Sequence, residues 1–142
     1  MEHKNSSWLL IFLAWTTALI ATLGSLFFSE VMGFPPCTMC WYQRICMYPL
    51  AVIFLVALIR NDKNVLFYAS PLVVVGWFWA FYHSLLIYGV IKEEMTPCSL
   101  GVPCSVSYFN WLGFIDIPTL SLTAFTLIAI FLVILYKKGF GK

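Results

Sequence analysis

Four long stretches of apolar residues run through this chain of 142 residues. Three of them contain no charged residue or histidine, and the third in chain order contains only His83. A helix that crosses a bilayer needs about 20 mostly apolar residues, which three of the stretches supply directly. The second, residues 45–59, is shorter, but the flanking Arg44 and Arg60 can extend their charged ends to the membrane surface, and Trp41 and Tyr42 can extend its apolar length. We therefore expect four spanning helices, over residues 8–29, 41–59, 68–91 and 117–136.

The composition supports a membrane protein. Hydrophobic residues make up 62% of the chain and charged residues only 10%, whereas a soluble domain has about a quarter of its residues charged. The sequence predicts an all-α integral membrane four-helix bundle with two short extracytoplasmic loops, as a single domain over 1–142. The net charge of +2 is spread over short loops. We therefore expect membrane lipid around the chain and no nucleic-acid partner.

The basic residues indicate how the helices are oriented. With four spans both termini lie on one side of the membrane, and that side holds most of the lysines and arginines. These are Lys4, Arg60, Lys63, Lys137, Lys138 and Lys142, against Arg44 and Lys92 on the other side. Because short cytoplasmic loops are enriched in lysine and arginine, we expect both termini in the cytoplasm. Two cysteine pairs then face outward, where disulfides persist.

The first cysteine pair is the C-x-x-C motif of Cys37 and Cys40, at the start of the second predicted helix. This spacing suits a redox-active disulfide, and both the positive helix end and Arg44, one turn later, favour a reactive thiolate. We expect that thiolate at Cys40, beside Arg44 at the outer edge of the bilayer. A static disulfide, with Arg44 as an interfacial anchor, is the other interpretation. Cys46 is expected to be a buried apolar cysteine.

The second pair, Cys98 and Cys104, flanks the loop sequence Ser-Leu-Gly-Val-Pro. Closing so small a ring stabilises a fold by about 2–3 kcal/mol, and an exposed disulfide is accessible to an attacking thiolate. Disulfide exchange and a static staple are both open interpretations, and zinc held by the four paired cysteines is a third. No histidine supports zinc and the compartment is oxidising, so we expect no metal.

Two further features accompany these pairs. His83 lies in the outer half of the third predicted helix, where an ionisable residue indicates either a functional site or a neutral, hydrogen-bonded interior histidine. The uncharged aromatic segment 105–115 is expected to lie on the membrane surface. Asp116 and Pro118 then predict the start of the fourth helix.

Taken in order, these residues resemble the DsbB/BdbC family of disulfide bond formation proteins, over nearly the whole chain. The matching elements are the segment 36–44 (PCTMCWYQR), the pair Cys98/Cys104, His83, and the segment IPTLSL that begins at Ile117. The short spacing between Cys98 and Cys104 is similar to that of the BdbC-like members. The resemblance implies an enzyme, a quinone-dependent thiol–disulfide oxidoreductase of the bacterial plasma membrane.

The resemblance also implies a route for electrons. An extracytoplasmic thioredoxin-fold thiol oxidase of DsbA/BdbD type attacks the Cys98–Cys104 disulfide, at Cys98, and leaves oxidised. The electrons pass to Cys37–Cys40 through a transient Cys37–Cys104 bridge. Cys40 then reduces a membrane quinone, either ubiquinone or menaquinone.

In the same implied scheme, Arg44 polarises a quinone carbonyl and His83 belongs to the same quinone-binding pocket. Two other classes of protein also fit the sequence. One is a non-enzymatic tetraspan protein whose disulfides are structural. The other is a related quinone-linked reductase that runs electrons toward thiols, since the direction depends on reduction potentials.

Overall fold

The computed structural model describes residues 2–92, 98, 103–104 and 116–139. Helices make up nearly all of this part of the chain, and no strand occurs among the described residues. The helices are α1 (Glu2–Leu26), the π-helical turn η1 (Phe27–Val31) that extends it, α2 (Thr38–Arg60), α3 (Val65–Ile87) and α4 (Ile117–Gly139). The predicted all-α class with four long apolar helices is therefore confirmed.

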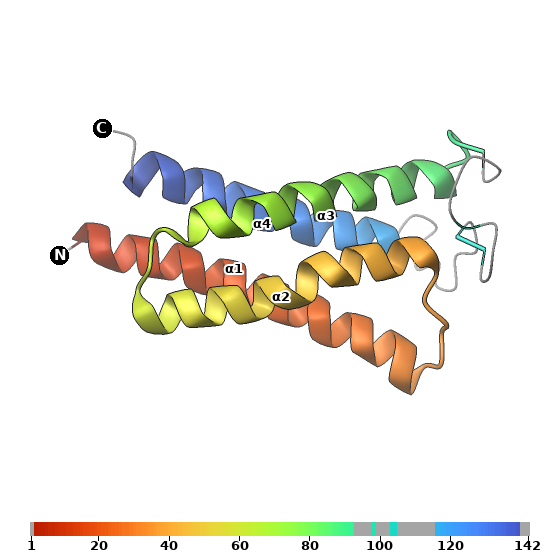
Figure 1. Ribbon diagram of the computed structural model, residues 1–142, viewed down its shortest axis with the longest axis horizontal. Helices are drawn as coiled ribbons and strands as arrows, with labels where there is room; N and C mark the ends of the chain where they lie inside the picture. The colour runs from red at the N-terminus through yellow and green to blue at the C-terminus, as the bar shows by residue number, and fades with distance from the viewer. Residues whose placement is uncertain (1, 93–97, 99–102, 105–115, 140–142) are drawn as a thin grey trace.

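The helices form a bundle in which each packs against its neighbours in the chain and α1 also packs against α4 (Figure 1). The start of α1 and the end of α4 lie at one end, where Lys138 Nζ donates to Ser6 Oγ at 2.8 Å. The connection between α2 and α3 lies at this end too, and the first turn of α2 lies at the other (Figure 1). Consecutive helices therefore run in opposite directions, as in an up-and-down bundle.

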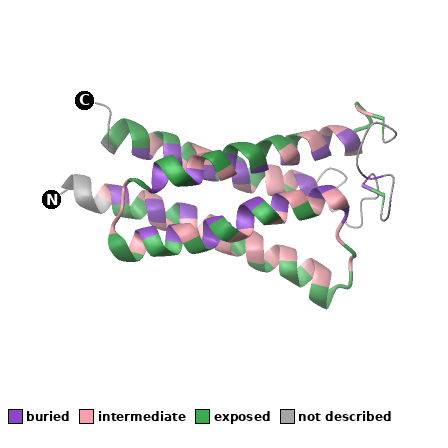
Figure 2. Cartoon of the chain, viewed as in Figure 1, coloured by how far each residue is buried: buried purple, intermediate pink, exposed green. Residues whose placement is uncertain are grey.

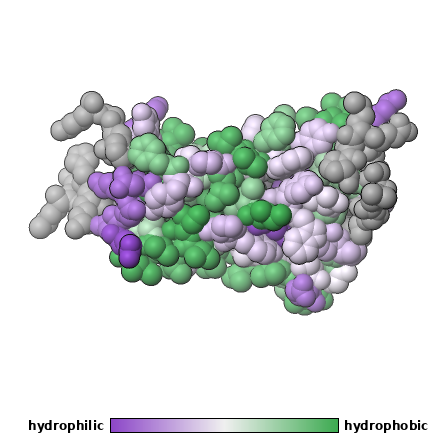
Figure 3. All heavy atoms as spheres, in the orientation of Figure 1, coloured by the Kyte–Doolittle hydropathy of each residue, from purple (hydrophilic) through white to green (hydrophobic). Residues whose placement is uncertain are grey.

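The outer surface of the bundle is apolar. All four helices are long and apolar enough to cross a membrane. Their inward faces are buried, while large apolar side chains such as Val52 and Ile59 are exposed on the outside (Figure 2). Figure 3 shows apolar side chains over the middle of the visible face and the strongly hydrophilic ones mainly toward its ends. Helices that are apolar on every face are typical of a lipid surrounding, and the chain is a multi-pass membrane protein.

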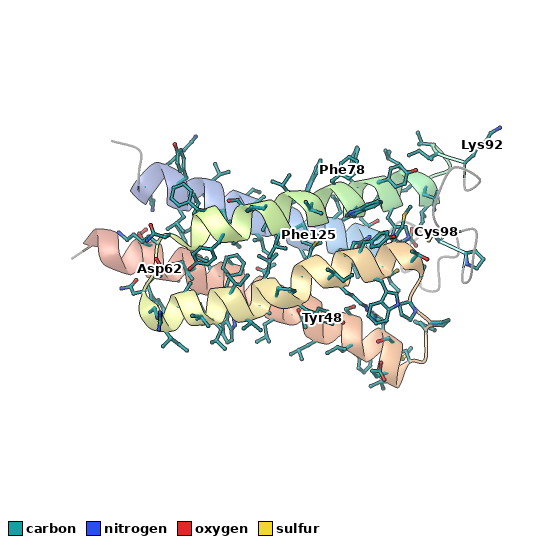
Figure 4. The ribbon with its side chains drawn as sticks, in the orientation of Figure 1. Tyr48, Asp62, Phe78, Lys92, Cys98 and Phe125 are labelled. Carbon is teal, nitrogen blue, oxygen red and sulfur yellow. A yellow bond between two sulfur atoms is a disulfide. The ribbon has the colours of Figure 1, made fainter. Side chains whose placement is uncertain are left out.

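Gly76 allows α3 to approach α4 closely. The ring of Phe125, which is fully buried, occupies the space that a Cβ at position 76 would fill. Figure 4 places Phe125 in the middle of the bundle. Small residues permit such close packing between membrane helices, where lipid supplies no hydrophobic drive for association.

The connection between α2 and α3 is held by polar groups. Asn61 ends α2 in the left-handed conformation, with φ of 53°. Asp62 then accepts hydrogen bonds from the Asn64 backbone N–H at 2.9 Å and from the Tyr68 hydroxyl at 2.8 Å. These two bonds lower the pKa of the Asp62 carboxyl. They fix the short turn between the two helices.

The second cysteine pair lies at the opposite end of the bundle, between α3 and α4 in the chain. α3 ends at Ile87, earlier than the residue 91 expected from the apolar stretch, because the chain turns there through Gly89 at φ of 73°. α4 begins at Ile117, directly after Asp116, as the sequence predicts. The expected surface segment 105–115 lies outside the described residues.

Candidate functional site

The two cysteine pairs lie together at one end of the bundle. Cys98 and Cys104 form a disulfide with a Cα–Cα distance of 5.8 Å. Both are buried, so the expectation of an exposed disulfide is wrong, and they form one cluster with Cys37, Met39 and Leu86, against which Cys40 packs. Figure 4 shows Cys98 at the end of the molecule opposite Asp62. A loop disulfide and the first turn of α2 therefore share one buried site.

Cys37 caps the N-terminus of α2. Its backbone is extended, at φ of −73° and ψ of 169°, and its Sγ accepts the Cys40 backbone N–H at 3.3 Å. The Sγ atoms of Cys37 and Cys40 are 2.7 Å apart and unbonded. Forming a disulfide would bring them closer by about 0.7 Å. The structure thus has the first pair as a dithiol and the second pair as a disulfide.

When one of these two thiols loses its proton, the negative charge is stabilised on the sulfur of Cys37. A hydrogen bond from the Cys40 thiol, opposed by burial and helped by His83, lowers the pKa of Cys37 to about 4 from an ordinary value of 9.0. The backbone N–H of Cys40 adds to the effect. The sequence predicts the thiolate at Cys40 instead. The difference arises mainly because the Cys40 thiol donates to the Cys37 sulfur, and His83 adds to this effect from α3.

His83 contacts both cysteine pairs from α3. Its Nε2 lies 3.8 Å from Cys37 Sγ and 3.2 Å from the carbonyl oxygen of Cys104. Its Nδ1 lies 3.0 Å from Gln43 Nε2, which can only donate, so Nδ1 accepts and Nε2 carries the proton. His83 is only 2% exposed. This neutral tautomer points an N–H at the Cys104 carbonyl and at the sulfur of Cys37.

Gln43 is a residue that the sequence analysis missed. It is buried on α2 and makes the hydrogen bond to His83 described above. A polar side chain next to an arginine at the start of a predicted helix resembles any residue at a membrane surface. Its one sequence signal is its place three residues after Cys40, which puts it near the same helix face.

Arg44 is held against α1. Its Nε donates to Ser25 Oγ at 2.8 Å, its Nη2 donates to the Ser25 carbonyl at 2.9 Å, and the guanidinium lies 5.5 Å from the centre of the Trp41 ring. Ser25 lies just before the chain changes from α1 into the π-helical turn η1. Such π-helical turns are frequent at functional sites. Nothing in the sequence marked Ser25, because it is one of several hydroxyl residues in an apolar helix.

A cavity of about 470 Å³ opens beside these groups and is lined by residues of all four helices. Five of the six predicted site residues line it: Cys37, Cys40, Arg44, His83 and Cys104. Its volume lies within the range of about 300–1,000 Å³ typical of small-molecule sites, and apolar side chains make up most of its wall. An apolar cavity with a few polar groups suits a lipid-soluble ring compound.

Tyr48 is a further lining residue that the sequence did not indicate. It follows Cys40 and Arg44 along one face of α2, at intervals of one helical turn. Its hydroxyl is buried and has no hydrogen-bond partner among the described residues. A buried, unpaired hydroxyl costs free energy unless a ligand or water satisfies it. The donor set of the cavity therefore fits a ligand with carbonyl oxygens.

Comparison with known proteins agrees with this chemistry. The family model for disulfide bond formation protein DsbB matches residues 4–135. The chain is 47% identical over 125 residues to disulfide bond formation protein C of Bacillus subtilis (strain 168), covering 88% of this chain and 91% of that protein. It is 44% identical over 138 residues to a probable disulfide formation protein of Metapseudomonas resinovorans, covering 96% of each. No solved structure matches the chain.

Proposed function

The chain belongs to the DsbB family of disulfide bond formation proteins, and we propose that it reoxidises an extracytoplasmic thioredoxin-fold thiol oxidase and passes the electrons to a membrane quinone. Family membership implies thiol–disulfide oxidoreductase activity. The observation that carries the full proposal is the contact of His83 with both cysteine pairs, beside an apolar cavity lined by Cys40 and Arg44.

The first step is disulfide exchange with the partner, which is of DsbA/BdbD type. The thiolate of the partner attacks Cys98, and the Cys104 sulfur leaves with the electron pair of the broken bond. The second thiol of the partner then displaces Cys98, so the partner departs oxidised. Cys98 and Cys104 are left as a dithiol. Two electrons have moved from the partner to this chain.

The second step moves these electrons to the first pair. The Cys104 thiolate attacks an oxidised Cys37–Cys40 disulfide at Cys37, and Cys40 leaves as the thiolate. Cys98 then displaces Cys37, which restores the Cys98–Cys104 disulfide. The shared burial of Cys37, Cys98 and Cys104 supports this exchange. So do the short distances from His83 Nε2 to Cys37 Sγ and to the Cys104 carbonyl oxygen. The resulting dithiol and disulfide are the states that the structure contains.

The third step takes place at the cavity. A quinone, either ubiquinone or menaquinone, accepts two electrons and two protons when bound. Arg44 is held in place by Ser25, and further N–H groups of its guanidinium can bind a carbonyl oxygen. Tyr48 offers a hydroxyl and His83 belongs to the same wall. The Cys37 thiolate attacks the Cys40 sulfur as the electrons leave through Cys40, and this closes the Cys37–Cys40 disulfide.

The orientation follows from charge. Arg60, Lys63, Lys137 and Lys138 lie at the end of the bundle that carries the termini, opposite the cysteines. By the positive-inside rule we place this end in the cytoplasm of a bacterial cell and the cysteines outside. The whole chain then acts as one four-helix domain.

Quinone reduction by the purified protein in detergent tests the proposal, with a reduced thioredoxin-fold oxidase as electron donor. We expect turnover with wild type and with Cys46→Ser, and no turnover with Cys40→Ser or Cys98→Ser. Cysteines that do not react with the donor, with no turnover for any quinone, would instead indicate structural disulfides. Faster electron flow from quinol to thiols would indicate a reductase.

A further inference from the structure

The reduced site brings three metal-binding atoms together. The Sγ atoms of Cys37 and Cys40 and a ring nitrogen of His83 all lie within 4.8 Å of one another. The cysteines come from the first turn of α2 and the histidine from α3. We expect no metal from the sequence, where the only metal site considered was zinc held by the four paired cysteines. The structure provides a different set of ligands.

We propose that Cys37, Cys40 and His83 form a three-ligand site for a thiophilic divalent ion such as Zn²⁺, and that the site exists only while this cysteine pair is reduced. Two thiolates and one imidazole are a set of ligands that Zn²⁺ uses in proteins, with a fourth position left to water or another ligand. Each turn of the proposed cycle passes through this dithiol. The site would therefore appear once in every cycle.

The distances suit such an ion. Bonds of about 2.3 Å to sulfur and about 2.0 Å to nitrogen, in tetrahedral geometry, place the ligand atoms about 3.5–3.8 Å apart. Cys37 Sγ and His83 Nε2 are 3.8 Å apart already. The two sulfurs, now 2.7 Å apart, must separate by about 1 Å. Rotation of the half-buried Cys40 side chain toward the cavity that it lines provides this separation.

A neighbouring residue orients the histidine ligand. Gln43 occupies Nδ1 of His83 and so directs Nε2 toward the sulfurs. When the ion occupies Nε2, the Gln43 side-chain oxygen can accept the proton then carried by Nδ1, because an amide offers both a donor and an acceptor. Partners of this kind orient metal-binding histidines.

Binding and catalysis exclude each other. Coordination forms two metal–sulfur bonds and one metal–nitrogen bond, displaces the remaining thiol protons, and moves no electrons. The Cys37–Cys40 disulfide has no thiolate to offer, so the oxidised protein cannot hold the ion. Conversely, the bound ion keeps the two sulfurs apart. If the proposed electron route holds, excess Zn²⁺ outside the cell arrests the cycle reversibly at the reduced stage.

Metal binding can be measured without a donor or a quinone. The Cys98→Ser/Cys104→Ser protein in detergent is reduced, freed of reductant, and titrated with Zn²⁺ against a chromophoric chelator or with Co²⁺ by absorption. We expect one ion per chain with cobalt–thiolate bands. Cys46→Ser in the same background is the matched control and should bind equally. Gln43→Leu should weaken binding about 10–100-fold, and Cys37→Ser or His83→Ala should weaken it more.

Protection of the cysteines from alkylation is a second measurement, and it tests the proposal even where the variants fold poorly. Zn²⁺ should protect Cys37 and Cys40 of the reduced protein, but not Cys46, from alkylation, and a chelator should restore the reaction. The absence of binding, equal binding by the oxidised protein or by Cys37→Ser, or loss of binding in Cys46→Ser would each overturn the proposal. Failure of the proposed electron route would leave these results unchanged, so the two proposals can be distinguished.

Discussion

The Nε2 atom of His83 lies 3.2 Å from the carbonyl oxygen of Cys104, which joins α3 to the second cysteine pair. The same nitrogen lies 3.8 Å from Cys37 Sγ, at the N-terminus of α2. One buried imidazole therefore contacts both halves of the proposed electron route. A purely structural pair of disulfides would not need this contact, since each pair could close its own loop.

The thiolate of Cys37 gives a direct pH prediction. Its alkylation rate in the reduced protein should stay constant from pH 8 to about pH 5 and fall tenfold per unit below its pKa of about 4. In the unfolded chain the rate should fall over the whole range, because the ordinary pKa is 9.0. Folding lowers this pKa, so the linked stability of the reduced form is full above pH 9 and is lost as pH falls through about 4. Mass spectrometry of iodoacetamide-treated protein measures the rate. Equal profiles in folded and unfolded protein would contradict the assignment.

The side chain at position 40 should control the pH at which the Cys37 thiol loses its proton. The largest cause of the lowered pKa of Cys37 is the hydrogen bond from the Cys40 side chain. Cys40→Ser keeps a donor and should leave the titration low, whereas Cys40→Ala removes it and should move the titration upward. The pH profile of Cys37 alkylation distinguishes the two. Identical profiles for Ser and Ala would show that this hydrogen bond does not stabilise the thiolate.

We expect the Ser25 hydroxyl to affect quinone reduction through Arg44, which it holds in place. Ser25→Ala removes the hydroxyl that accepts from Arg44 Nε, while the backbone carbonyl at Nη2 stays. Hydrogen bonds to charged groups contribute about 1.5–3 kcal/mol, so kcat/KM for quinone should fall about 10–100-fold. The rate of exchange with the thiol donor should not change, and Ser25→Thr, which keeps the hydroxyl, should retain most of the activity. Steady-state kinetics with quinone and donor varied separately provide the test. A loss at the donor step would contradict it.

The contact between Gly76 and Phe125 predicts a stability effect. Gly76→Ala places a methyl group in the space of the Phe125 ring and should destabilise the bundle by about 1–3 kcal/mol. Gly24→Ala is the matched control, because no atom lies within 4 Å of a Cβ there and alanine favours a helix. Unfolding in detergent, followed by circular dichroism, compares the two. Equal stability would mean that α3 and α4 are packed less closely than described.

The fold was largely predictable because lipid imposes a strict rule. A spanning helix must be long, apolar and nearly free of charge. Three of the four apolar stretches meet that rule directly, and the second meets it once its flanking residues are counted, without any knowledge of tertiary contacts. Helix ends depend on local turns, and α3 stops at Ile87 because of the turn through Gly89. The start of α4 at Ile117 carries its own signal in Asp116 and Pro118 and was predicted.

The site was predictable only in part. Cysteines, an arginine and a membrane histidine are rare enough to stand out from an apolar sequence. Gln43, Ser25 and Tyr48 are ordinary residues, and their roles depend on contacts between different helices or on burial that spacing does not reveal. The location of the thiolate at Cys37 depends on the hydrogen bond from the Cys40 thiol and on the contact with His83 of another helix, which the motif alone does not reveal.

The central claim is that the two cysteine pairs form one electron route, and a trapped disulfide tests it most directly. The Cys40→Ser/Cys98→Ser protein keeps Cys37, Cys104 and Cys46 as its cysteines. On mild oxidation in detergent or membranes, peptide mapping should find a Cys37–Cys104 disulfide within each chain. It should form at the same rate after Cys46→Ser is added. A protein in which Cys37 and Cys104 stay unpaired, or in which Cys46 takes either partner, would contradict the account.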